Sequence, residues 1–261
     1  MLLDLKRLDP TVASKNLKEM GLSAFNSLTF LDIIRCLNLS SDSSGFSAIP
    51  PTHNDRQRSD LSVEVENLKH QGRITDVIGS LKFCGPPSLW FSTLVFQRPK
   101  AYLSQYADIV NDLLALNNDL SFNVWLEDRY SEIAFNYTPD EKKVSVKAYE
   151  TFFRSTCPSA KIMVCSESGI DGVPMEFAVE KFSLISAEEF LSALPFHKRQ
   201  PISVKVLDVV HFAWNCYIMH HCPGIHLAGT SSKRHFQLFR KVLGKQVSVI
   251  LVPMGSAEFA K

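Results

Sequence analysis

The stretch ISVKVLDVVHFAWNCYIMHHCPGIHLAG, residues 202–229, places a long apolar segment directly before a short one. Nearly every position from Ile202 to His221 is apolar, which is typical of a helix buried on most of its sides. The run IHLAG at 225–229 has the length and composition of a buried strand. A buried helix that leads into a buried strand indicates a fold in which crossover helices connect parallel strands.

The same alternation extends along most of the chain. Apolar runs with strand character occur at 81–85, 122–127, 161–165, 225–229 and 247–252. Segments of helical periodicity lie between them. They are residues 100–116, residues 140–153 after Pro139, a segment that begins at the capping pair Ser186 and Glu189, and residues 230–243. This order predicts an α/β fold, a Rossmann-like, doubly wound, parallel five-stranded sheet with helices on both faces. In such sheets the ligand lies at the carboxyl ends of the strands.

The chain divides into three parts by composition. Residues 1–39 contain two helix-like segments and predict an N-terminal helical extension. Residues 40–59 are rich in serine, proline and polar side chains, which bury too little apolar surface to offset the entropy of ordering, and they predict a flexible loop or linker. Residues 60–261 carry the alternating strands and helices and predict the Rossmann-like catalytic domain.

Composition and charge narrow the class of protein. The 261 residues are 45% hydrophobic and 21% charged, which excludes a disordered or collagenous chain. The formal net charge is +1, so no overall field attracts DNA or an anionic membrane, and a polyanionic partner must be held by a local patch. No apolar run reaches the roughly 18 residues of a membrane span. We therefore expect a cytoplasmic protein that binds neither DNA nor a membrane.

The cysteines and histidines do not form a metal-binding pattern. The six cysteines include no C-x-x-C pair, and we expect them to be reduced structural thiols. His220, His221 and His226 are close in sequence, but adjacent residues on a helix point about 100° apart. The sequence therefore predicts no metal ion. The motifs G-x-x-x-x-G-K-[ST] and G-x-G-x-x-G do not occur either, which argues against a P-loop NTPase or a dinucleotide enzyme.

A polar stripe interrupts the apolar helix. Asp208, His211 and Asn215 are spaced i, i+3 and i+7, which places them on one helix face. Burying each of these groups without a partner costs on the order of 1–3 kcal/mol, so the stripe faces either solvent or a polar pocket. We expect a pocket, because the helix leads into a strand of the sheet.

Further polar residues follow the predicted strands. Gly85 begins a Gly-Pro-Pro turn that would present Ser88 at the mouth of the sheet, although serine is also common in such turns for structural reasons. Glu127 and Asp128 follow the second strand, and Glu167 follows the third. These acids are candidates for binding a cationic substrate group, with ordinary loop acids as the alternative.

From about Ile74 to Gly255 the order of elements resembles the catalytic core of class I aminoacyl-tRNA synthetases of the archaeal and eukaryotic tyrosyl type. The resemblance is greatest from Val204 through HLAGTSSKRHFQLFRKVLG, residues 226–244, and FNVWLEDRYSEI looks like the family's second strand, whose acid would fall on Asp128. The family's ATP-binding signatures are not matched. GPPSLWFSTLVF contains no histidine of a HIGH sequence, and VPMGSAEFAK contains no KMSKS sequence.

A synthetase-like core without ATP motifs is similar to the cyclodipeptide synthases, which join two amino acids already activated on tRNA. This resemblance, in particular to the fungal arginine-containing group, implies aminoacyl-tRNA as substrate and no ATP or other cofactor. It implies Ser88 as the nucleophile, with Ser92 on the same turn as the alternative. His211 is the expected base and Asn215 its neighbour in the comparable stretch. The acids Asp208, Glu127 and Asp128 suit a guanidinium group.

Basic residues form a candidate tRNA-binding patch, although a solvated helix face is equally compatible with them. They are Arg98, Lys100, Lys233, Arg234, Arg240, Lys241 and Lys245. Two other functions remain open. The chain would alternatively be a non-catalytic tyrosyl-tRNA-synthetase-like paralogue that binds tRNA or protein, or a small-molecule transferase or hydrolase that shares only the topology.

Overall fold

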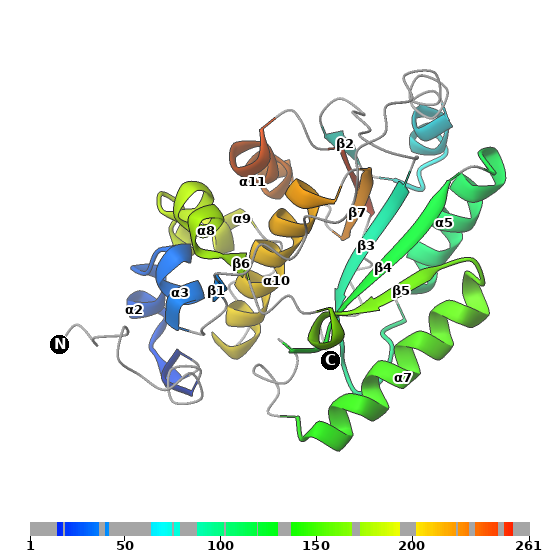
Figure 1. The fold of residues 1–261 in the computed structure, drawn as a ribbon. Coiled ribbons are helices and arrows are strands. Elements are labelled where there is room, and N and C mark those ends of the chain that lie inside the picture. Colours follow the sequence, from blue (N-terminus) through cyan, green and yellow to red (C-terminus); the bar gives the residue numbers. More distant parts are fainter. Residues whose placement is uncertain are drawn as a thin grey trace.

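The fold is described from a computed structural model of the chain. The described residues are 15–17, 19–36, 40–41, 64–74, 76–78, 88–101, 103–118, 120–129, 137–168, 173–193, 202–222, 224–229, 233–244 and 248–252. A central sheet has layers of helices on both of its sides (Figure 1).

The central sheet confirms the predicted parallel architecture. Its strands are β2 (Asp76–Ile78), β3 (Ser88–Leu94), β4 (Ser121–Glu127), β5 (Lys161–Val164), β7 (Ile225–Gly229) and β8 (Ser248–Val252), in the spatial order β2-β8-β7-β3-β4-β5. The five strands from β8 to β5 are mutually parallel, and β2 adds a short antiparallel edge beside β8. The chain order changes direction between β3 and β7, which is the switch point where such sheets bind ligands.

The first parallel strand differs from the prediction. The run 81–85 lies outside the described residues, and the strand that pairs with β4 and β7 is Ser88–Leu94. Its side chains alternate between two buried layers, because Trp90 and Leu94 belong to one core cluster and Leu89 and Phe91 to the other. The Gly-Pro-Pro segment therefore precedes the strand instead of following it.

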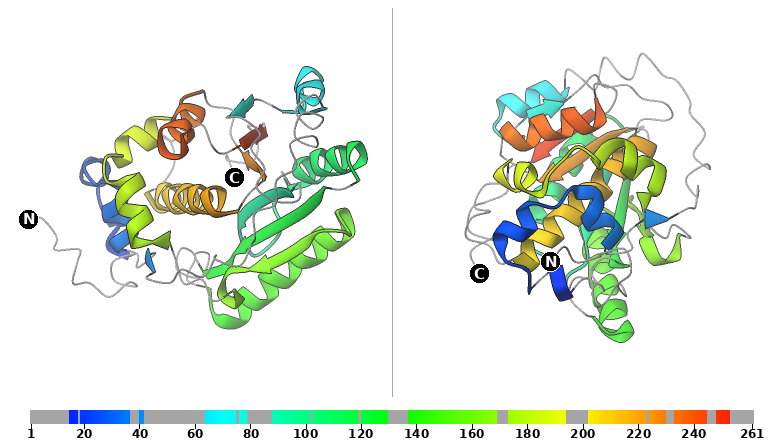
Figure 2. Two further views of the ribbon diagram at one scale, coloured as in Figure 1. Left: turned by 45° about the horizontal axis from the view of Figure 1, so that its top comes forward. Right: turned by 90° about the vertical axis from the view of Figure 1, so that its left-hand side faces the viewer.

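Each face of the sheet is covered by different helices (Figures 1 and 2). The helices α5 (Leu103–Leu116) and α7 (Pro139–Thr156) pack their apolar side chains on one face. The helices α10 (Ile202–His221) and α11 (Lys233–Leu243) share the other cluster with Trp125. This arrangement confirms the predicted doubly wound fold.

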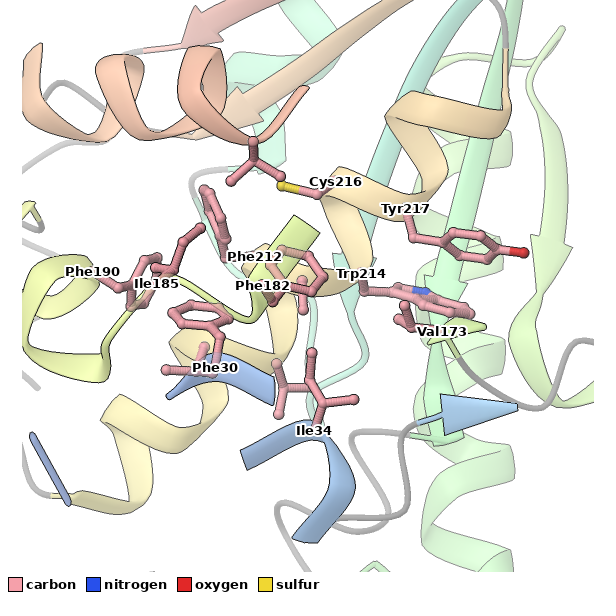
Figure 3. Packing of buried hydrophobic residues seen from close by; sticks show 14 of the residues in the cluster. Phe30, Ile34, Val173, Phe182, Ile185, Phe190, Phe212, Trp214, Cys216 and Tyr217 are labelled. Carbon is pink, nitrogen blue, oxygen red and sulfur yellow. The ribbon is translucent and has the colours of Figure 1, made fainter. Parts of the chain in front are cut away.

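The long helix α10 lies between the sheet and a second layer of helices, as Figure 2 shows. This layer contains α2 (Leu22–Asn26), α3 (Phe30–Cys36), α8 (Met175–Phe182) and α9 (Ala187–Ala193). Phe30 packs its ring 4.9 Å from Phe190 and 5.8 Å from Phe212 of α10, measured between ring centroids (Figure 3). The prediction that this helix is buried on most sides is therefore confirmed, and the N-terminal helices share its core.

Local capping signals explain where several helices begin. Thr138 caps α7 with a reciprocal pair of hydrogen bonds to Glu141, and Pro139 occupies the first turn. Thr29 and Asp32 exchange the same kind of bonds at the start of α3. The backbone N–H of Glu189 donates to Ser186 Oγ at 3.0 Å, as the predicted capping pair requires.

Three smaller elements, two short strands and one 3-10 turn, also belong to the described structure. Ser40–Ser41 (β1), within the predicted linker, pairs in parallel with Val173–Pro174 (β6). The 3-10 turn η2 (Cys165–Glu167) follows β5 at the carboxyl edge of the sheet.

We predict that Gly224→Ala destabilises the protein strongly. Gly224 has φ +137°, and a Cβ there would lie 2.3 Å from the carbonyl oxygen of Ser88 on the neighbouring strand. Overpacking and backbone strain together imply a loss of about 3 kcal/mol or more in the free energy of unfolding, measured by urea denaturation. Gly72→Ala is the control, because its φ is also positive but no atom lies within 4 Å, and it should cost about 1 kcal/mol. Equal losses in the two variants would contradict the close approach of β7 to β3.

Candidate active site

Four polar side chains form a connected chain of contacts between the sheet and α10. Ser92 Oγ on β3 donates to Glu127 Oε1 at the end of β4. Glu127 Oε2 lies 3.0 Å from His211 Nδ1 on α10, and His211 Nε2 lies 3.0 Å from Asn215 Nδ2. We call Ser92, Glu127, His211 and Asn215 the polar relay. It joins three elements that are distant in the sequence.

The relay lies in an otherwise apolar interface. Ser92 shares its face of β3 with Trp90 and Leu94, and Glu127 follows Trp125 by two residues on the same face of β4. Glu127 has no exposed surface, and Ser92 and Asn215 are 5% and 6% exposed. Because a buried carboxylate is costly without hydrogen-bond donors, Ser92 and His211 supply the partners that allow Glu127 to occupy this position.

Two groups of α10 connect the relay to solvent. The side chain of His211 is 36% accessible, and Asp208, one turn earlier, is partly buried. Burial acts to lower the pKa of His211, but the charge and hydrogen bond of Glu127 and the charge of Asp208 outweigh it, so this pKa is raised. Burial raises the pKa of Asp208 to about 7, although the charge of His211 acts in the opposite direction. The accessible side of the site therefore carries two groups with raised pKa values, and that of Asp208 is about 7.

The polar stripe predicted on the long helix meets a polar partner from the sheet. Its members His211 and Asn215 belong to the relay, and Asp208 acts on His211 electrostatically. The predicted role of His211 as a base for a serine is not reflected in a direct contact, since its ring nitrogens face Glu127 and Asn215. Through Glu127, His211 is still linked to Ser92.

Ser88 does not lie where the sequence placed it. It is the first residue of β3, where its Oγ lies 2.9 Å from Ser121 Oγ at the start of β4. Glu127 ends β4, six residues along the strand from Ser121, which corresponds to about 20 Å. The prediction that Ser88 lies at the carboxyl edge is therefore wrong, because Ser88 begins the strand instead of following one. Ser92, expected on the turn, lies within the strand and contacts the relay.

The other predicted acids have different surroundings. Asp128 is 1% exposed and accepts a hydrogen bond from the backbone N–H of Ser166 at 2.9 Å. Its second oxygen lies 3.8 Å from Lys142 Nζ, so the carboxylate ties the end of β4 to η2 and α7. Glu167 is exposed on η2, and Gly85 lies outside the described residues.

The predicted basic patch divides into two groups along the sheet. Arg98 and Lys100 are exposed beyond the carboxyl end of β3, and Lys100 Nζ lies 4.7 Å from the centroid of the Phe96 ring. Arg234 is exposed in the first turn of α11, which follows the adjacent strand β7. The last turn of α11 carries Arg240 and Lys241.

The other members of the predicted patch do not add to these exposed basic groups. Lys241 Nζ is paired with Glu189 Oε1 at 2.8 Å. Lys233 begins α11, and Lys245 lies outside the described residues. The exposed basic residues nearest the carboxyl edge are thus Arg98, Lys100 and Arg234.

The described residues contain no group of three histidine, cysteine or acidic side chains placed to hold a metal ion. His226 lies 2.8 Å from the carbonyl oxygen of Cys222 through Nε2 and stacks beside Trp90. The five cysteines in the described ranges are buried free thiols. Within those same ranges no helix is long and apolar enough to cross a membrane.

The contact between Ser92 and Glu127 was missed at the level of sequence. Both residues are polar positions inside apolar strands, and that signal marks each as unusual. Neither position indicates which strand is adjacent or in which register. The pairing of Leu94 with Glu127 in the β3–β4 ladder places Ser92 and Glu127 within hydrogen-bonding reach.

The likeness to known proteins lies in the fold. No family model matches the sequence, and no curated protein does. Among solved structures, tyrosyl-tRNA synthetase from Archaeoglobus fulgidus, complexed with L-tyrosine, is similar over 66% of this chain at 13% identity and a TM-score of 0.50. The tyrosyl-tRNA synthetase from Aeropyrum pernix is similar over 75% of this chain at 12% identity, also with a TM-score of 0.50. The matches cover 59% and 62% of those two chains. The chain therefore has a Rossmann-like fold of the class I aminoacyl-tRNA synthetase type.

We predict that Asp208→Asn stabilises the protein at pH 8 but not at pH 4. The pKa of Asp208 is about 7 in the folded protein and 3.8 ordinarily, so folding binds a proton between these values. The free energy of unfolding of the wild-type protein should therefore fall as pH rises from about 4 to about 7. The variant should not show this part of the decrease, because its amide does not titrate. Urea denaturation across this range measures the effect. The exposed Asp108→Asn is the control, and parallel curves for wild type and Asp208→Asn would contradict the prediction.

Proposed function

We propose that this chain is a tRNA-dependent cyclodipeptide synthase, which condenses two aminoacyl groups from aminoacyl-tRNAs into a cyclic dipeptide through an aminoacyl-enzyme. The observation that carries the proposal is the hydrogen bond from Ser92 to Glu127 within the polar relay, in a sheet of the synthetase type. The residues after β3, which contain no HIGH sequence, support the use of amino acids that are already activated. The proposed nucleophile is Ser92, the alternative that the sequence offered to Ser88.

The first step forms the aminoacyl-enzyme. Ser92 Oγ attacks the carbonyl carbon of the ester that joins the amino acid to the terminal ribose of tRNA, and its proton passes to Glu127. The tetrahedral intermediate collapses, the ribose oxygen leaves, and Glu127 returns the proton to it. One ester replaces another, so the step needs neither ATP nor a metal. His211 supports Glu127 through the contact at Nδ1.

Two amine attacks then complete the product. The amine of the aminoacyl group on Ser92 attacks the ester of a second aminoacyl-tRNA, which forms the first peptide bond. The ribose oxygen of the second tRNA leaves and takes up the proton that the amine loses. The free amine of the dipeptide then attacks the Ser92 ester, which forms the second peptide bond, and its proton passes to Ser92 Oγ and restores the hydroxyl. Asp208 is partly buried and acts electrostatically on His211, and its carboxylate can bind an ammonium or a guanidinium group of the substrate.

The burial of the relay favours a second candidate, a non-catalytic tyrosyl-tRNA-synthetase-like paralogue that binds tRNA or protein. Ser92 is only 5% exposed and Glu127 is fully buried, as expected of a polar network that stabilises the packing of α10 on the sheet. The two candidates differ in one respect, because only the synthase forms a covalent ester on Ser92.

The test of the proposed reaction compares two serine variants on the same strand. The full chain, Ser92→Ala and Ser88→Ala are expressed in a bacterial host, and the extracts are searched for new cyclic dipeptides by mass spectrometry. Ser92→Ala should lose the product at least 100-fold, because no acyl-enzyme can form. Ser88→Ala should retain the product, because Ser88 begins β3 and contacts Ser121 at the amino end of β4, far from Glu127. Circular dichroism of the purified proteins establishes that both variants fold.

The other outcomes are equally decisive. A product that persists in Ser92→Ala and disappears in Ser88→Ala would return the nucleophile to Ser88. A folded wild-type chain that binds tRNA but forms neither product nor acyl-enzyme would favour the non-catalytic paralogue.

We predict that Arg98, Lys100 and Arg234 bind tRNA phosphates more than Arg240 and Lys241 do. The first three follow the carboxyl ends of β3 and β7, whereas Lys241 is already paired with Glu189. Replacing Arg98 or Arg234 by alanine should weaken tRNA binding and reduce the slope of log K against log salt by about 0.7–0.9. The control is Arg240→Ala, which should leave the slope unchanged. The measurement is fluorescence anisotropy of labelled tRNA at several salt concentrations, and identical slopes for all variants would contradict the assignment.

A further inference from the structure

Asn215 makes two contacts with the same histidine. Its Nδ2 donates to the backbone carbonyl oxygen of His211 at 2.9 Å and lies 3.0 Å from Nε2 of the His211 ring. The side chain is 6% exposed, so bulk water does not readily replace either contact. The opposite ring nitrogen, Nδ1, faces the carboxylate of Glu127 at 3.0 Å.

These contacts determine the orientation of the Asn215 amide. A carbonyl oxygen accepts but does not donate, so the amide atom 2.9 Å from it must be the nitrogen. The second hydrogen of that nitrogen is then directed to His211 Nε2, which must present a lone pair to accept it. Since Glu127 accepts a hydrogen bond from Nδ1, the only state of His211 that satisfies all partners is the neutral ring with its proton on Nδ1.

We propose that Asn215 is a positioning residue that opposes protonation of His211 and so leaves Glu127 able to accept the proton of Ser92. The catalytic consequence rests on the proposed function, whereas the state of His211 is a property of the protein alone. Asn215 thereby acts through His211 and Glu127 on Ser92, without touching the reacting atoms.

Protonation of His211 has a defined structural cost. A proton on Nε2 would face the Asn215 amide nitrogen, so the amide would have to turn and lose its bond to the backbone carbonyl. The ionisable groups that favour protonation are Glu127 from β4 and Asp208 from α10, the two that act on His211 among the described residues. An imidazolium beside Glu127 would stabilise its carboxylate and make it a weaker acceptor for the Ser92 proton.

The test reads the ring nitrogens directly by ¹⁵N NMR of the full chain labelled in its histidines. The chain has 8 histidines, so His211→Gln identifies the signal. At pH 8.5 we expect a protonated Nδ1 and an unprotonated Nε2. Asn215→Asp should raise the titration midpoint of His211 by about one pH unit or more, because a carboxylate accepts the Nε2 proton. Asn215→Leu, which removes the donor, should raise it by less.

The control and the functional readout separate the inference from the proposed function. Asn123→Asp makes the same change at a buried asparagine of β4 near Ser121 and should leave the His211 midpoint unchanged. In Asn215→Asp, the acidic limb of the pH profile for acyl-enzyme formation, followed by intact mass, should move upward with the NMR midpoint. A protonated Nε2 at pH 8.5, or an unchanged midpoint in Asn215→Asp, would overturn the inference. The expected NMR result without any acyl-enzyme in the wild type would overturn the proposed function alone.

Discussion

The structure depends on a carboxylate in an apolar interface. Glu127 has no exposed surface and lies between β4 and α10, where an ionised group without donors would cost several kcal/mol. Ser92 and His211 supply the polar contacts that Glu127 needs. The elements that carry them, β3 and α10, otherwise pack in this interface through apolar side chains. The relay therefore defines one position of α10 along the sheet, because a shift by one turn would separate His211 from Glu127.

The burial of α10 follows from the same arrangement. One side of the helix packs on the sheet and carries the relay, and the other side packs against the layer formed by α3, α8 and α9. Aromatic rings fill the second contact, with Phe30, Phe190 and Phe212 at its centre. The N-terminal helices thus help to hold the helix that supplies two of the four relay residues, so they support the candidate site from a distance.

The serine of this site is not its most solvent-exposed group. The serine and the carboxylate are buried, whereas His211 and Asp208 provide the accessible surface. In the proposed reaction, His211 and Asp208 would be the first of these groups that a substrate reaches. The basic residues beyond β3 and at the start of α11 lie at the same edge of the sheet.

The sequence by itself determined the parallel five-stranded sheet, the buried helix at 202–221, the capped start of α7 and the stripe of Asp208, His211 and Asn215, because these depend on periodicity and on residues a few positions apart. Only the tertiary structure decided which serine meets the carboxylate and what Asp128 binds. Ser92 and Glu127 are 35 positions apart, and Glu127 and His211 are 84 apart. Such contacts arise from strand register and helix docking, which local patterns do not encode. The sequence Gly-Pro-Pro is likewise compatible with either end of a strand, so it did not indicate whether Ser88 begins or follows one.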